Sequence, residues 1–264
     1  MALRSANITV MIQAAHKAAR PLVRDFGEVE NLQVSIKGPG DFVSAADRRA
    51  EQILRRELSR ARPGFGFLLE ESGPIPGEDR DQRWVVDPLD GTTNFLHGLP
   101  HFAISIALER RGELLAGVIY DPIKDELFCA EKGAGAYLND RRLRVSGRTD
   151  LATCLIGTGI PVLDWPGRER GYAGQLERLA GEVAGIRRLG TASLDLAYVA
   201  AGRLDGFWEF GLKPWDVAAG IVLVREAGGL VGRLEGDGDF AAGTLLASNA
   251  VIHPRLVQLL RVNQ

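Results

Sequence analysis

The stretch "WVVDPLDGTTNF" (Trp84–Phe95) contains an apolar, strand-like run that leads into two aspartates three positions apart. A glycine and two threonines follow Asp87 and Asp90 directly. Pro, Gly, Asn and Asp are the ordinary residues of turns, so the stretch taken alone is most typical of a surface turn. The alternative is that both carboxylates bind a divalent cation, while the backbone after Gly91 approaches an anion.

The composition of the 264-residue chain is that of a soluble globular protein, with 45% hydrophobic and 25% charged residues. A net charge of -2 gives no general attraction to nucleic acid or to an anionic membrane. The N-terminal residues lack the apolar core of a signal peptide, and no apolar run approaches the roughly 18 residues of a membrane span. We therefore expect a cytoplasmic protein without membrane or direct nucleic-acid contacts, in which Cys129 and Cys154 are reduced core residues.

Helical spacing of apolar residues predicts helices over Ile8–Phe26 and Ala46–Arg60. The two glycines and the proline of Ile36–Phe42 predict a mobile loop between them. Residues 65–131 are short apolar runs broken by Gly, Pro and Asp, which is typical of sheet strands. Helices and strands alternate after that, with helices expected at Glu169–Val183, Ser193–Ala201 and Trp215–Ala227, and strands at 153–159, 186–189 and 206–210.

This order of elements predicts an α/β (α+β) layered sandwich. We expect one domain over residues 1–264, in which an N-terminal half of about 1–150 packs against a C-terminal half of about 151–264.

Further carboxylates stand at the ends of predicted elements. Glu70 follows an apolar strand, Asp216 opens the helix after Pro214, and Asp47 stands at the start of the second helix. Each has an ordinary explanation, because strand ends are solvated and a first-turn carboxylate is favoured by the helix dipole. Oxygen ligands of this kind also suit Mg²⁺, but spacing alone does not establish that they converge.

In combination these segments resemble the inositol monophosphatase family, within the wider group of lithium-sensitive, magnesium-dependent phosphatases. "WVVDPLDGTTNFLHGLPHFAISIAL" (84–108) is similar to the first signature of that family and "KPWDVAAGIVLVREAGG" (213–229) to the second. "FLLEESG" (67–73) resembles the paired-glutamate strand, except that Leu69 stands where glycine is usual. The resemblance covers about residues 8–262, and the last block is most similar to the bacterial extragenic-suppressor branch.

The resemblance implies a metal site. One Mg²⁺ would be held by Glu70, Asp87 and the carbonyl of Leu89, and a second by Asp87, Asp90 and Asp216. A third, weaker ion would lie near Glu70 through waters.

The resemblance also implies roles in catalysis and substrate binding. The amides of Gly91 and Thr92 would bind the phosphate, and Asp47 would help the Thr92 hydroxyl to orient and deprotonate the attacking water, with Glu70 as a further catalytic residue. Lys37 would lie on a mobile loop over the metals. The residues implied to contact the substrate are Asp90, Gly190, Thr191, Ala192 and Glu209.

The fold implied is an αβαβα sandwich, commonly a homodimer. The implied function is hydrolysis of myo-inositol 1-phosphate, or of a related small polyol or sugar phosphate, by attack of a metal-activated water and with sensitivity to Li⁺. Fructose-1,6-bisphosphate, histidinol phosphate and 3'-phosphoadenosine nucleotides are alternative substrates, although the carboxylate of Glu209 disfavours a second phosphate. A non-enzymatic partner of the transcription or RNA-processing machinery is the alternative of a different class. The complete ligand set favours catalysis, and the two roles are compatible.

Overall fold

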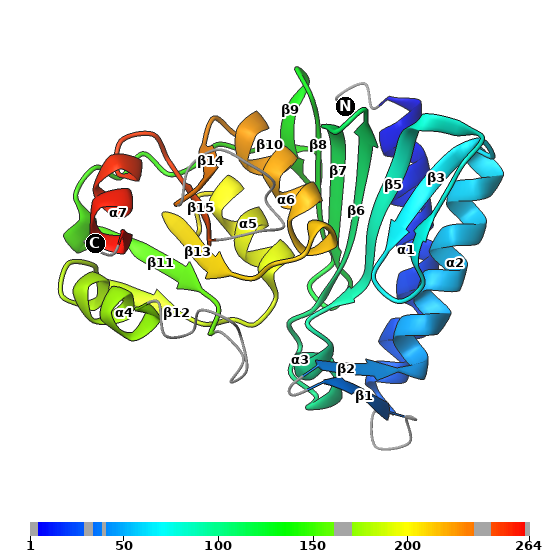
Figure 1. Ribbon diagram of the computed structural model, residues 1–264, viewed down its shortest axis with the longest axis horizontal. Coiled ribbons are helices and arrows are strands. Elements are labelled where there is room, and N and C mark those ends of the chain that lie inside the picture. Colours follow the sequence, from blue (N-terminus) through cyan, green and yellow to red (C-terminus); the bar gives the residue numbers. More distant parts are fainter. Residues whose placement is uncertain (1–4, 29–33, 39–40, 161–170, 235–243, 262–264) are drawn as a thin grey trace.

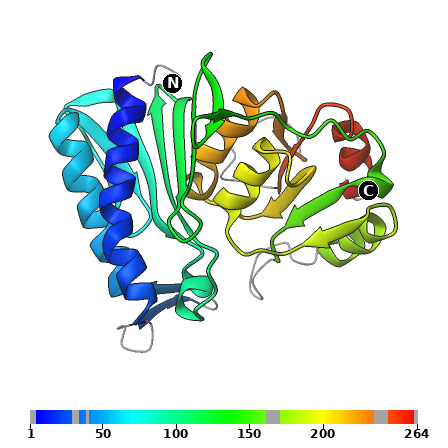
Figure 2. The same ribbon diagram turned by 180° about the vertical axis from the view of Figure 1, so that it is seen from behind.

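Two long helices lie side by side against one face of a large sheet (Figures 1 and 2). The computed structural model describes residues 5–28, 34–38, 41–160, 171–234 and 244–261, with the backbone alone described for 34–38 and 41–44. Helix α1 spans Ala6–Phe26 and begins at Ser5, whose hydroxyl accepts a hydrogen bond from the Ile8 amide. It continues through Pro21, and helix α2 spans Ala45–Ala61. Both predicted N-terminal helices are therefore confirmed.

The large sheet has eight strands in the order β10-β9-β8-β7-β6-β5-β3-β4. Neighbouring strands are antiparallel except for the parallel pair of β3 and β5. The strands are β3 (Phe65–Leu69), β4 (Gly73–Ile75), β5 (Asp79–Asp90), β6 (Ala103–Arg110), β7 (Glu113–Asp121), β8 (Glu126–Glu131), β9 (Gly135–Leu138) and β10 (Arg141–Arg142).

The second sheet has five strands in the order β12-β11-β13-β15-β14. Its central strand β13 pairs in parallel with β11 and antiparallel with β15. The strands are β11 (Leu155–Thr158), β12 (Gly185–Arg187), β13 (Gly206–Phe210), β14 (Leu230–Arg233) and β15 (Thr244–Ser248). A single 3-10 turn, Leu151–Thr153, precedes β11.

The remaining long helices complete the layers. Helices α5 (Ala192–Ala200) and α6 (Pro214–Glu226) lie between the two sheets, and their buried residues form one core with residues of both. Helices α4 (Tyr172–Ala180) and α7 (His253–Leu260) pack on the outer face of the five-stranded sheet. The result is the predicted αβαβα sandwich, with α1 and α2 as the other outer layer.

Close backbone approach holds the middle layer together. A Cβ on Gly220 of α6 would lie 2.5 Å from the Cβ of Leu196 on α5. A Cβ on Gly117 of β7 would lie 2.6 Å from the carbonyl oxygen of Ala219. Both glycines therefore lie where α6 packs directly against a neighbouring element, and a larger residue at either position would push the two elements apart.

Several expectations from the sequence are wrong in detail. Most of Ile36–Phe42 lies in an antiparallel pair of strands, β1 (Val34–Gly38) and β2 (Asp41–Ser44), because the alternation of β-branched and polar residues outweighs the glycines. The helix expected at Glu169–Val183 is the shorter α4, and residues 169 and 170 fall outside the described part. The strand expected at 186–189 is β12, which ends at Arg187. The pattern after Gly229 did not predict β14, β15 or α7.

Cys129 and Cys154 are both buried and form no disulfide, as expected. None of the helices in the described residues combines the length and the apolar character that a membrane span requires. The division into halves of about 1–150 and 151–264 remains a proposal.

Candidate active site

A bulge in β5 places Asp87 and Asp90 on the same face of the large sheet. Residues three apart on a regular strand point to opposite faces. Here Asp87 pairs with Ser105 and Asp90 with Ala103, so three steps along β5 correspond to two along β6. The predicted tight turn at Pro88 and Leu89 is thus a bulge inside a strand that runs on to Asp90. The Ser105 hydroxyl donates to the carbonyl of Trp215, so this face is the one that α6 covers.

Glu70 joins the same place from the neighbouring strand. It follows β3, and its amide donates to the carbonyl of Val86 at 3.2 Å, directly before Asp87. The turn that follows is held by Glu51 of α2, whose carboxylate accepts hydrogen bonds from the amide of Glu71 and from the Ser72 hydroxyl. Sequence reasoning missed Glu51. Its signal was a charged residue on the buried face of an amphipathic helix, four positions after Asp47.

Asp216 approaches from the opposite side, in the first turn of α6. Its Oδ2 accepts a hydrogen bond of 2.6 Å from the amide of Lys213, and Pro214 occupies the first helical position, where no amide hydrogen is needed. The helix dipole favours negative charge at this end. The N-terminus of α6 therefore presents a carboxylate to the bulge of β5.

The four carboxylates are close enough to disturb one another's ionisation. Burial raises the pKa of Asp87 well above its ordinary value, and the charges of Glu70, Asp90 and Asp216 raise it further. Burial and the charge of Asp90 likewise raise the pKa of Asp216. Asp87 also shares a hydrogen bond with Glu70, which favours a proton on one of the two. The structure thus brings together Glu70, Asp87, Asp90 and Asp216.

Asp90 is oriented by the start of α5. Its Oδ2 accepts a hydrogen bond of 2.7 Å from the amide of Ser193. Burial raises the pKa of Asp90 to about 6, although the hydrogen bonds from Ser193 act in the opposite direction. The Asp87 carboxylate is held in a similar way, because its Oδ1 accepts from the Leu89 amide at 2.9 Å.

This donor set fits a hard divalent cation. Within the described ranges, no three Asp, Glu, His or Cys side chains already surround a common point as metal ligands would. The oxygen chemistry is nevertheless what Mg²⁺ selects, and carboxylates that repel one another need a positive charge between them to ionise together. The Leu89 carbonyl lies beside them, and its oxygen is 3.0 Å from the Thr92 hydroxyl.

The hydroxyl of Thr92 also lies 3.0 Å from Oδ1 of Asp47, which is fully buried in the first turn of α2. A hydroxyl has one hydrogen, and the carboxylate is the stronger acceptor of the two neighbours. Donation to Asp47 leaves the lone pairs of the Thr92 oxygen available for a second partner. The geometry is therefore compatible with the pairing that the family resemblance implies.

Gly91 begins a single helical turn, α3 (Thr92–Leu96), with a left-handed φ of 93°. A Cβ at this position would lie 2.5 Å from Oγ1 of Thr191 and 3.1 Å from the carbonyl oxygen of His101. Glycine is required for both reasons. The same contacts place the Gly91–Thr92 turn directly against the loop that carries Gly190, Thr191 and Ala192.

Glu209 lies on β13, in the other sheet, and its carboxyl packs so closely against Gly159 that a Cβ there would overlap it. Burial raises the pKa of Glu209 to about 8, the charge of Asp90 adds to the effect and Arg188 opposes it. Burial raises the pKa of the Asp195 carboxyl well above its ordinary value, and the charges of Glu209 and Asp90 raise it further. Sequence reasoning missed Asp195, which looks like an ordinary first-turn carboxylate of α5.

Lys37 lies in β1, where the backbone alone is described, so its role remains a prediction. The other site residues predicted from the sequence lie on the elements that meet around the β5 bulge.

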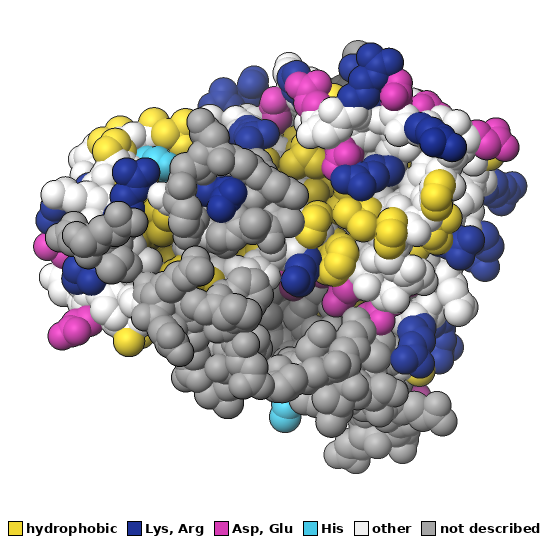
Figure 3. Space-filling view, viewed as in Figure 1, with side chains coloured by type: hydrophobic (Ala, Val, Ile, Leu, Met, Phe, Trp, Pro, Cys, Tyr) yellow, Lys and Arg dark blue, Asp and Glu magenta, His cyan; other side chains and the backbone are white. Residues whose placement is uncertain are grey.

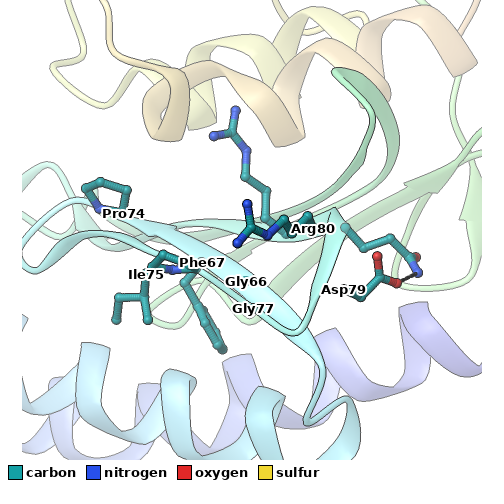
Figure 4. A pocket seen from close by; sticks show the side chains of 10 residues that line it. Gly66, Phe67, Pro74, Ile75, Gly77, Asp79 and Arg80 are labelled. Atoms are coloured by element: carbon teal, nitrogen blue, oxygen red, sulfur yellow. Dashed lines mark hydrogen bonds between the residues drawn. The ribbon is translucent and has the colours of Figure 1, made fainter.

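The surface cavities of the described residues include two that lie elsewhere. One of about 320 Å³ is lined by residues of β3, β4 and β5 that include Phe67, Pro74 and Arg80 (Figure 4). Another, of about 410 Å³, adjoins it at Asp79 and Gln82. None of the site carboxylates lines either cavity. On the face shown in Figure 3, basic and acidic side chains are interspersed among the described residues.

Comparison with known proteins identifies the family. The model of the "Inositol monophosphatase family" matches residues 4–264. An inositol-1-monophosphatase of Mesorhizobium japonicum is 59% identical over 98% of this chain and 97% of its own length. The Nus factor SuhB of Pseudomonas aeruginosa is 48% identical over 92% of this chain and 91% of its own length.

Solved structures of proteins with the same family names are similar to this one. The extragenic suppressor protein suhB of Bartonella henselae superposes with a TM-score of 0.94 at 59% identity, covering 98% of this chain and all of that one. An inositol monophosphatase of Thermotoga maritima superposes with a TM-score of 0.87 at 35% identity, covering 97% of each chain. The match over nearly the whole length, together with the conserved layering, means that this chain belongs to the inositol monophosphatase family.

Proposed function

We propose that this protein is a Mg²⁺-dependent phosphomonoesterase that hydrolyses myo-inositol 1-phosphate or a related small polyol or sugar phosphate. The observation that carries the proposal is the meeting of four carboxylates, from β3, β5 and α6, beside the Gly91–Thr92 turn. Family membership supports an inositol-phosphate phosphatase.

The proposed metal ligands are Glu70, Asp87, Asp90, Asp216 and the Leu89 carbonyl, for two or three ions. When bound, Mg²⁺ would neutralise the charge of the phosphate and lower the pKa of a water at the site. The chain itself supplies position, through the bulge of β5 and the hydrogen bonds that orient each carboxylate.

Around that centre the remaining residues handle the phosphate and the proton. The amides of Gly91 and Thr92 would donate to the phosphate oxygens. The Thr92 hydroxyl, held by Asp47, would accept a hydrogen from the attacking water while its own hydrogen passes toward the buried carboxylate. Glu70 would orient the same water. Lys37 would lie over the metals, on the segment formed by β1 and β2.

The alcohol part of the substrate would lie toward the second sheet. We place its hydroxyls near Asp90, Gly190, Thr191, Ala192 and Glu209. A carboxyl with a pKa of about 8 retains its proton at neutral pH, so Glu209 can both donate to and accept from a hydroxyl. A neutral carboxyl brings no positive charge to a second phosphate, so this partner suits a hydroxyl of inositol 1-phosphate better than the second phosphate of fructose-1,6-bisphosphate.

The test is phosphate release by the purified protein with Mg²⁺ present or chelated. The panel is inositol 1-phosphate, fructose-1,6-bisphosphate, histidinol phosphate and 3'-phosphoadenosine 5'-phosphate. We expect Mg²⁺-dependent release that is fastest on inositol 1-phosphate and is inhibited by millimolar Li⁺. Preference for another substrate would leave the metal proposal in place and contradict the assignment of the substrate pocket. Release that is equally fast with Mg²⁺ chelated would contradict the metal proposal.

We also propose that the protein is cytoplasmic and forms a homodimer. Sedimentation of the purified protein would test the dimer. A role beside the transcription machinery is a second candidate, because several relatives are named Nus factor SuhB. Absence of phosphate release from the folded protein on every substrate would favour that second role.

A further inference from the structure

Asn94 connects two segments of the site that are far apart in the chain. It lies in α3, is 5% exposed, and its Nδ2 donates to the carbonyl oxygens of His101 and Leu189, each at 2.9 Å. The Oγ1 of Thr191 lies 3.4 Å from the same nitrogen. One amide group therefore reaches both the segment that leads into β6 and the loop before α5.

The surroundings require a donor at this point. A carbonyl oxygen only accepts, and the Thr191 hydroxyl gives its own hydrogen to the His101 carbonyl at 3.0 Å. The two hydrogens of the Asn94 amide match the two carbonyls. An aspartate of the same shape would instead place an oxygen against these acceptors and leave a buried charge uncompensated.

The two segments that Asn94 joins are the two halves of the proposed substrate site. On one side, α3 begins with Gly91 and Thr92, and it is only five residues long. On the other side, a Cβ on Gly190 would lie 3.3 Å from Nδ2, so the amide packs directly beneath the loop with Gly190 and Thr191. A single helical turn has little rigidity of its own, and its position relative to that loop depends on these bonds.

We propose that Asn94 is a positioning residue that fixes the separation between the phosphate-binding turn and the hydroxyl-binding loop. This inference rests on the proposed function. A substrate that engages both segments needs the correct separation, and misplacement of a binding group by about 1 Å can cost roughly 100-fold in rate. A substrate that is held only by its phosphate does not depend on the separation between the turn and the loop. Asn94 thereby contributes to selectivity for phosphate esters of small polyols.

The experiment compares inositol 1-phosphate with p-nitrophenyl phosphate, an ester whose aryl group has no hydroxyls for the loop. We expect Asn94→Ala to lower the ratio of kcat/KM for the two esters by about tenfold, mainly through KM for inositol 1-phosphate. Inhibition by inorganic phosphate should stay within about twofold of wild type, because the turn itself remains. Thr93→Ala is the matched control, since Thr93 is the preceding residue of the same turn and is exposed.

Loss of stability alone would lower both activities by one factor, and that result would overturn the inference, as would an unchanged ratio. Circular dichroism establishes that each variant is folded. If Asn94→Ala does not fold, Asn94→Ser retains one donor and should still lower the ratio about threefold, with an unchanged ratio again contradicting the inference. Wild-type protein that hydrolyses p-nitrophenyl phosphate but not inositol 1-phosphate would instead contradict the assignment of the substrate pocket, and the inference that rests on it.

Discussion

The Thr92 hydroxyl lies 3.0 Å from Oδ1 of Asp47, although 45 residues separate the two in the chain. Asp47 belongs to α2, on the outer layer, and is fully buried where the helix begins. The contact therefore ties the outer helical layer to the turn that follows β5. In the proposed mechanism, this pair is the route by which a proton leaves the attacking water.

Asp47→Asn should reduce turnover with little effect on substrate binding. Asparagine keeps the shape and one acceptor oxygen but removes the charge that favours donation from Thr92. General-base contributions of this kind are worth about 10²- to 10⁴-fold, so we expect a fall of kcat in that range with KM for inositol 1-phosphate nearly unchanged. Steady-state kinetics at saturating Mg²⁺ measures it.

The control for this variant is Arg48→Ala, one position further along α2 and exposed. It should retain wild-type kcat. A folded Asp47→Asn protein with wild-type kcat would remove Asp47 from the mechanism.

The raised pKa of Glu209 predicts a pH dependence of stability in the metal-free protein. Its pKa is about 8 in the folded protein and 4.5 ordinarily, so the folded state holds a proton that the unfolded state has lost between these values. The stabilising contribution is complete below pH 4.5, declines as pH rises and is lost above about pH 8. Glu209→Gln cannot titrate, and its stability should fall less steeply over this window.

Thermal unfolding in the presence of a chelator, from about pH 5 to about pH 9, measures the slope for each protein. Glu177→Gln, on the exposed face of α4, is the control and should keep the wild-type slope. Identical slopes for wild type and Glu209→Gln would show that Glu209 carries no raised pKa.

The packing of α5 on α6 predicts the effect of Gly220→Ala. The new Cβ would lie 2.5 Å from both Cβ and Cδ1 of Leu196, and Cβ cannot move without the backbone of α5. Overpacking costs about 1–3 kcal/mol, which exceeds the gain of up to about 1 kcal/mol in helix propensity. We therefore expect Gly220→Ala to unfold at a lower temperature than wild type in a thermal melt without denaturant.

Gly232→Ala offers the comparison, because nothing lies within 4 Å of a Cβ at that position. It should change stability by no more than about 0.5 kcal/mol. Equal melting temperatures for both variants would mean that the two helices are free to separate.

The sequence predicted the elements whose signals are local. Helices α1 and α2 have clear apolar periodicity, and α6 is bounded in the sequence by Pro214 and by Gly228 and Gly229. The order of strands and helices indicated layers. The αβαβα arrangement itself followed from the resemblance to a family. Periodicity could not predict the bulge at Pro88, because the register of a strand is a property of its partner.

The supporting residues of the site were missed for a similar reason. Glu51 and Asn94 bind backbone groups of segments that are distant in sequence, and the spacing of residues does not predict such partners. Asp195 is a first-turn helix carboxylate in the sequence, and only the fold buries it beside Glu209. The strands at Ile36–Phe42 were missed because glycine and proline were given more weight than the alternating apolar residues around them.

The most direct test of the central claim is phosphate release from inositol 1-phosphate by wild type and by Asp90→Asn, measured over the same Mg²⁺ titration. Asp90 is the carboxylate that the bulge of β5 turns toward Asp87. Replacement by asparagine, which has nearly the same size, removes the charge of a proposed ligand without leaving a cavity. We expect wild-type release that rises with Mg²⁺ and saturates, and no release above background from Asp90→Asn with a wild-type circular dichroism spectrum. Release by the folded variant at the wild-type rate and with the same Mg²⁺ dependence would contradict this expectation.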